Sequence, residues 1–361
     1  MGPFDAALLG ATLILATPIL LAALGELISE RAGVVNVGVE GMMLVGAFFS
    51  FLVAWKSGSL VLGVAGGIAA GIGLAAVMGV LAITAKADQI VAGIGLLLLA
   101  AGLTSFLFEE LTAGRGQVQL DRIGPLEIPL LSDIPDVGPA LFARDPIVYA
   151  AFLSVPAVWF LLYRTRWGLA IRSAGEAPAA LDTAGVSVVA VRWAGVLTAG
   201  AFAGLGGAFL SIAQLGLFQQ EMTAGRGFLA LAAVFFGRWH PLGVLGACLL
   251  FGAADALQLR LQGAGSVPAS VWVLVALVAA AYLVRLARER QRRAVSPIAL
   301  VVVGVVAAAA VALSISPPDG RLPSQLWLAL PFILALLVLA GAVGRARVPA
   351  ALMRPYTRDE R

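Results

Sequence analysis

The sequence predicts an all-α protein that crosses a membrane many times. Of its 361 residues, 61% are hydrophobic and 12% are charged, whereas globular chains are about 45–50% apolar and about 25% charged. The mean hydropathy is +0.99, and the apolar residues form runs longer than the ~18 residues that distinguish a membrane helix from a buried core helix. The predicted fold class is therefore a polytopic membrane protein surrounded by lipid bilayer.

About 11 membrane segments are expected. A helix that crosses ~30 Å of hydrocarbon at ~1.5 Å per residue needs about 20 apolar residues. The run 226–237 is too short to cross as a straight helix, so we expect a half-helix or a re-entrant element covered by protein or by a water-filled cavity. Ten other runs are long enough: 6–28, 37–55, 60–85, 88–108, 146–163, 190–215, 242–259, 268–286, 296–315 and 325–344.

The first run, 6–28, is expected to stay in the protein as a span. No Lys or Arg precedes Arg31, so the run lacks the basic region with which a secretory signal peptide begins. Pro18 lies near its middle and should kink the helix.

The basic residues predict the orientation, because Lys and Arg are enriched in cytoplasmic loops. With the N-terminus outside and 226–237 counted as one crossing, 17 of the 24 Lys and Arg residues lie inside and 7 lie outside. This topology puts the C-terminus in the cytoplasm. The excess of Lys and Arg in the inside loops also accounts for the net charge of +4. We therefore expect no nucleic-acid partner.

Two loops outside the membrane carry information. The outside loop 109–145 is rich in acidic residues and prolines and should be exposed and partly extended, with or without an extracytoplasmic partner. The inside loop 164–189 is basic and rich in small residues. A short helix over 173–183 is expected there, with Pro178 tolerated near its first turn. That helix could fit a partner's groove or lie on the bilayer surface without a partner.

Ionisable residues in apolar runs indicate a second region of interest. Glu40 follows Asn36 and Gly38 at the start of the second run. A charge in hydrocarbon is costly, and for Asp or Lys at a helix centre the free energy of insertion is ~2.5–3.5 kcal/mol. Glu40 should therefore face the bundle interior or an aqueous cavity, on a solute pathway or at a helix break. For Asp255 a pathway role and a satisfied helix contact both remain open.

Several kinds of site are excluded by the residue counts. The only lysines, Lys56 and Lys86, lie outside any GxxxxGKS/T motif, so the chain has no phosphate-binding loop for ATP. The only histidine, His240, lies in a proline turn, and Cys248 is the only cysteine. A catalytic triad, a zinc or iron–sulfur site and an internal disulfide are therefore not expected. We expect no catalytic residue, cofactor or metal, and the energy for transport must come from another subunit or an ion gradient.

Three stretches resemble the permease subunits of ABC importers for simple sugars and nucleosides, within the branched-chain amino acid and ribose permease family. They are ALGELISERAGVVNVGVEGMMLVGAF (23–48), RSAGEAPAALDTAGVSV followed by AGAFAGLGGAFLS (172–211), and MTAGRGFLALAAVFFGRWHPLG (222–243). The resemblance covers about 15–265, and the tail 322–356 is similar to the C-terminus of that family.

The resemblance implies a plasma-membrane permease that pairs with a second, related permease. Cytoplasmic ATPase subunits would drive it, and an extracytoplasmic binding protein would deliver the substrate. The loop at 172–184 resembles the helix that couples such permeases to their ATPase. The implied coupling residues are Arg172, Ser173, Gly175, Glu176, Ala177, Pro178, Asp182 and Gly185. Candidates for the translocation path are Asn36, Gly38, Glu40, Gly41, Met42, Met43 and Asp255.

The domain organisation expected from this resemblance has three parts. Residues 1–267 form the permease core, residues 268–320 an extra two-helix insertion, and residues 321–361 the final membrane helix and cytoplasmic tail. The insertion could regulate, recruit a partner or pack at the periphery.

The predicted function is the translocation of nucleosides or simple sugars by alternating access. The alternative is a stand-alone secondary transporter or channel for a small polar solute, with Glu40 or Asp255 as its coupling carboxylate.

Overall fold

Seven helices in the described part of the chain are long and apolar enough to cross a membrane. The computed structural model describes residues 6–113, 118–135, 137–263 and 348–356, with isolated residues between 272 and 314. The seven spans are α1 (Ala6–Arg31), α2 (Val39–Ser57), α3 (Leu60–Gly79) continued by the π-helix η1 (Val80–Thr84), α4 (Gln89–Thr112), α6 (Pro146–Arg164), α9 (Val188–Ala208) continued by the π-helix η2 (Phe209–Leu215), and α11 (Pro241–Gly263).

These spans coincide within a few residues with the first seven predicted runs. The predicted runs 268–286, 296–315 and 325–344, and with them the insertion 268–320, lie outside the described residues apart from isolated positions.

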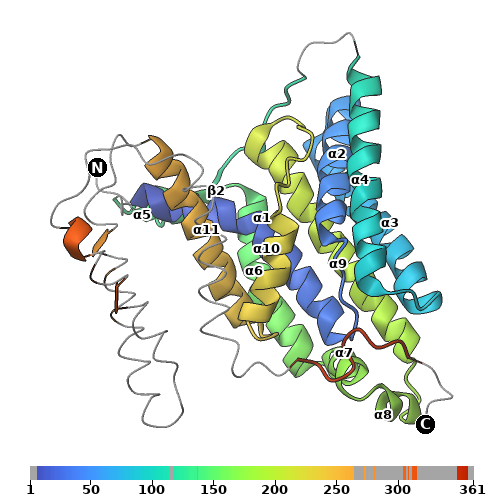
Figure 1. The fold of residues 1–361 in the computed structure, drawn as a ribbon. Coiled ribbons are helices and arrows are strands. Elements are labelled where there is room, and N and C mark those ends of the chain that lie inside the picture. The colour runs from blue at the N-terminus through green and yellow to red at the C-terminus, as the bar shows by residue number, and fades with distance from the viewer. Residues whose placement is uncertain are drawn as a thin grey trace.

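Helices α1, α2 and α9 form the centre of the bundle (Figure 1). Helices α3 and α4 pack on the side of α2, while α6 and α11 pack on α1. Most of α1 is buried, which suits its sequence because its apolar residues continue around the whole helix. The remaining surface of the outer helices is apolar, as expected for spans that face lipid.

Glycines bring the central helices into close contact. A Cβ atom at Gly71 of α3 would overlap the carbonyl oxygen of Gly200 in α9, and one at Gly207 would overlap the carbonyl oxygen of Met43 in α2. Lipid provides no hydrophobic force between helices, so backbones that approach this closely gain their stability from van der Waals contact.

Helix α2 begins inside the bundle rather than at its end. After α1 ends at Arg31, the chain turns back, and the amide of Asn36 donates to Glu26 Oε1 at 2.7 Å. Gly41 packs against Leu97, which lies eight residues beyond Gln89, the first residue of α4, or ~12 Å along that helix. The first turn of α2 therefore lies deep in the protein.

The short run predicted at 226–237 is α10 (Arg226–Phe236). Its first turn contacts Glu40, and Trp239, three residues after its end, contacts the end of α1. It therefore extends from the middle of the bundle to the end where Arg31 lies, which we call the base. Protein covers its start, as predicted for a short element.

Small elements lie outside the spans. In the loop predicted to be extended, β1 (Leu126–Glu127) pairs antiparallel with β2 (Ala143–Arg144), and α5 (Val137–Phe142) packs against α1. This two-stranded ribbon is a minor departure from an all-α fold. At the base, α7 (Arg166–Glu176) and α8 (Pro178–Thr183) join α6 to α9.

Candidate functional site

The predicted coupling segment is two helices, so the expected single helix over 173–183 is wrong. Helix α7 ends at Glu176, and Pro178 starts α8. Ala177 has φ −146° and ψ 71° because a following proline disfavours the helical conformation. Pro178 suits the first position of α8, where a missing N–H costs nothing. Gly185, with φ +80°, adopts after α8 the left-handed conformation that glycine favours.

The structure divides the predicted coupling residues into two groups. Glu176, Ala177 and Gly185 are exposed, Pro178 and Asp182 are partly exposed, and Leu181 anchors α8 with a buried side chain. Gly175 is buried, and Arg172 and Ser173 are partly buried on the side of α7 that faces the bundle. The first group forms a surface at the base, and the second, together with the carboxylate of Glu176, attaches that surface to the spans.

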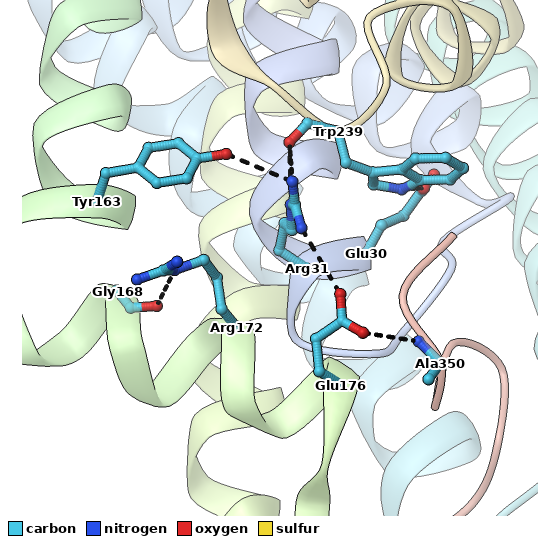
Figure 2. Close-up of polar contacts among 8 residues, drawn as sticks. All are labelled: Glu30, Arg31, Tyr163, Gly168, Arg172, Glu176, Trp239 and Ala350. Carbon is cyan, nitrogen blue, oxygen red and sulfur yellow. Dashed lines mark hydrogen bonds and ion pairs between the residues drawn. The ribbon is translucent and has the colours of Figure 1, made fainter. Parts of the chain in front are cut away.

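Arg31, at the end of α1, is the centre of this attachment (Figure 2). Its Nη1 lies 3.8 Å from Glu176 Oε1. Its Nε and Nη2 donate to the carbonyl oxygen of Trp239 at 2.9 and 2.6 Å, and Nη2 also donates to the Tyr163 hydroxyl at 3.4 Å. One guanidinium group therefore joins the end of α1, the end of α6, the end of α7 and the turn after α10.

Three further contacts stabilise the same cluster. A Cβ atom at Gly175 would overlap the carbonyl oxygen of Arg31, so only glycine lets α7 approach α1 this closely. The guanidinium carbon of Arg172 lies 5.1 Å from the centre of the Tyr163 ring, and its Nε donates to the Gly168 carbonyl at 3.4 Å. Such a cation–π contact is worth about 0.5–1 kcal/mol at an exposed site.

Four residues of this region were not predicted from the sequence: Glu30, Arg31, Tyr163 and Trp239. Trp239 is fully buried, and its Nε1 donates to Glu30 Oε2 (Figure 2). The partners are more than 200 positions apart in the chain, so spacing cannot reveal the pair. The available signal was that Arg31 and Trp239 lie within two of the stretches that resemble the permease family.

Among the predicted path residues, Glu40 has the most specific environment. Its buried carboxylate accepts from the amides of Gly225, at 2.8 Å, and Gly227, at 2.5 Å. These amides belong to the start of α10, where backbone N–H groups have no partner within the helix and the helix dipole favours a negative charge. Glu40 therefore joins the start of α2 to the start of α10.

The neighbouring path candidates are packed against protein in this conformation. Asn36, Met42 and Met43 are fully buried, and Asn36 Nδ2 lies 3.1 Å from Met42 Sδ. Gly38 and Gly41 contact Gly93 and Leu97 of α4. Asp255 is half-buried on α11. Of the predicted path carboxylates, Glu40 is bonded to the start of α10.

Comparison with known proteins finds a permease family and several permease relatives. The family described as branched-chain amino acid transport system / permease component matches residues 8–280. The putative glucose ABC transporter permease protein TsgC13 of Haloferax volcanii is 48% identical over 265 residues, which are 72% of this chain and 79% of the relative. The guanosine ABC transporter permease protein NupQ of Bacillus subtilis is 34% identical over 364 residues, 97% of this chain and 96% of the relative. The nucleoside ABC transporter permease protein NupC of Lactococcus lactis is 38% identical over 269 residues, 72% and 84% of the two chains. No solved structure matches.

The matched region covers α7, α8, α10 and the seven described spans, apart from the first two residues of α1. Permeases of this family work with an ATPase and a substrate-binding protein, and ATP hydrolysis belongs to a separate subunit. The chain therefore belongs to the permease-component family of the branched-chain amino acid transport systems and is a multi-pass plasma-membrane subunit of an ABC importer.

Proposed function

We propose that this permease translocates nucleosides or simple sugars by alternating access, with α8 as its contact with the cytoplasmic ATPase. The observation that carries the coupling role is the division at α7–α8: α8 is exposed, while the end of α7 is bonded to α1 through Arg31. A movement imposed on α8 would reach α1, α6 and the turn after α10 through one guanidinium group. The substrate class follows from relatives named for guanosine, nucleosides and glucose.

The path residues support a role in the movement of the spans. Helices α2 and α10 both begin within the bundle and are joined at Glu40, and broken helices of this kind surround the substrate sites of many transporters. Both carboxylate oxygens of Glu40 accept hydrogen bonds from backbone amides, so Glu40 serves as a cap of α10. A stand-alone secondary transporter would need this carboxylate to bind the coupling ion. The cap therefore favours the ABC importer.

The proposed topology has the N-terminus outside and the base in the cytoplasm. Helix α11 starts at the base, and residues 348–356 lie at the base again. Because α11 itself crosses away from the base, an odd number of crossings is needed between its end and residues 348–356, and the three predicted runs 268–286, 296–315 and 325–344 satisfy this. Residues 1–267 would be the core, and a second permease subunit would complete the pathway. The NupQ relative covers 97% of this chain, so the segment 268–320 is not peculiar to it.

The coupling role can be tested at Ala180, an exposed alanine of α8. We expect Ala180→Trp to reduce both co-purification of the ATPase and ATP-driven uptake at least about tenfold, because an indole is too large for a groove that receives small side chains. The matched control, Ala180→Ser, should behave as the wild type. Full uptake by the Trp variant would contradict the assignment of α8.

The alternative function has its own test in proteoliposomes that contain only the purified chain. We expect no uptake of guanosine or glucose under a proton or sodium gradient, and uptake once the ATPase, the second permease, the binding protein and ATP are added. Gradient-driven uptake by the chain alone would favour the secondary transporter.

A further inference from the structure

The end of the chain is built into the predicted coupling region. Residues 348–356, which we call the C-terminal strap, run along the base beside α7 (Figure 1). The Ala351 amide donates to the Gly175 carbonyl at 2.7 Å, and the Ala350 amide donates to Glu176 Oε2 at 3.3 Å (Figure 2). Both acceptors lie at the end of α7, in the centre of the predicted coupling motif.

The strap also contacts two spans. The Met353 amide donates to the carbonyl of Gly33, just after α1, at 3.1 Å. Arg192, in the first turns of α9, donates from Nη1 to the Arg354 carbonyl at 2.8 Å. Nine residues therefore connect the ends of α1 and α7 with the start of α9.

The residues that make these contacts, Ala351 of the strap and Arg192 of α9, are buried. Ala351 is 7% exposed, and a Cβ atom at Gly33 would lie 3.3 Å from its carbonyl oxygen and 3.0 Å from Arg192 Nη2. Arg192 is 3% exposed, and its Nε and Nη2 have no hydrogen-bond partner among the described residues. The strap carbonyl thus supplies a hydrogen bond to a buried arginine, and a buried charged donor is costly to leave without one.

We propose that the C-terminal strap is a positioning element of the transport cycle, which transmits movement of α7–α8 to α1 and α9 together. This inference rests on the proposed coupling role of α8. The direct link from α7 to α1 through Glu176 and Arg31 is a single ion pair of 3.8 Å whose carboxylate side chain is 48% exposed, and such pairs are weak. The strap adds backbone hydrogen bonds on both sides of that pair and extends the link to α9, the helix that contacts α2 and α3 through glycines.

The test uses the full importer and removes one hydrogen bond. Ala351→Pro deletes the amide that bonds to Gly175, whereas Ala351→Ser keeps it and serves as the matched control. We expect Ala351→Pro to reduce ATP-driven uptake per assembled complex roughly tenfold, a factor that corresponds to about 1.4 kcal/mol and to one buried hydrogen bond. ATPase co-purification and ATP hydrolysis should persist, so that hydrolysis is uncoupled from uptake.

A second variant, Ala350→Pro, guards against loss of folding in the first. It removes the longer and more exposed bond to Glu176, so we expect a smaller loss of uptake in the same direction. Wild-type uptake in both Pro variants would overturn the proposal. So would a loss of uptake that follows only the loss of bound ATPase, because the strap would then act in docking. Failure of the wild-type chain to bind an ATPase would instead overturn the coupling role of α8.

Discussion

At the scale of single residues, Glu40 shows how a membrane protein accommodates a buried carboxylate. Two backbone amides at the start of α10 bond to its two oxygens. Glu40→Ala would leave both amides unpaired and buried, and we expect a loss of about 2–3 kcal/mol in stability. The thermal unfolding midpoint of the detergent-solubilised chain should fall accordingly, with Glu40→Gln intermediate because its amide group offers only one acceptor oxygen.

The control for Glu40 is Glu110→Ala, which changes an exposed glutamate near the end of α4. Its unfolding midpoint should match the wild type, since surface substitutions usually change stability by less than about 0.5 kcal/mol. Equal midpoints for Glu40→Ala and Glu110→Ala would show that the α10 cap contributes nothing to stability.

At the same scale, the sequence predicted which charged residues lie in an apolar environment, but it did not predict their hydrogen-bond partners. A carboxylate near the start of an apolar run identified Glu40, because the cost of charge in hydrocarbon is large. Its partners lie more than 180 positions away, and the amides of Gly225 and Gly227 belong to the backbone, which carries no residue-specific signal. The hydrogen bonds from Arg31 to the carbonyl of Trp239 could not be predicted either, because their acceptor is also a backbone group.

At the scale of elements, the close contact of α3 with α9 makes a direct prediction about glycine. A Cβ atom at Gly71 would overlap the backbone of α9, whereas nothing lies within 4 Å of one at Gly73 on the same helix. We expect Gly71→Ala to lower stability by about 1–3 kcal/mol through overpacking. Gly73→Ala should be neutral or raise stability by up to about 1 kcal/mol, because alanine favours helix. Thermal unfolding in detergent compares the two, and equal midpoints would contradict this packing of α3 on α9.

The sequence predicted which segments form helices better than it predicted how those helices are arranged. Hydropathy and length sufficed for the seven described spans, since a span must satisfy its backbone internally and be apolar over ~20 residues. The division at Pro178 was missed because proline is compatible both with the first turn of one helix and with the start of another. The start of α2 inside the bundle was also not predicted. Asn36 and Gly38 indicate that the helix is broken there, but they do not indicate how deep in the bundle the break lies.

At the scale of the whole molecule, the proposed topology puts α8 in the cytoplasm and the end of α2 outside. The only cysteine, Cys248, is buried, so single cysteines can be introduced without removing it. We expect a membrane-impermeant maleimide to label Ser57→Cys, exposed at the end of α2, in intact spheroplasts. Thr183→Cys, exposed on α8, should be labelled only in inside-out vesicles. The reverse pattern would invert the topology and remove α8 from the reach of an ATPase, because a cytoplasmic motor can act only on a surface that faces it.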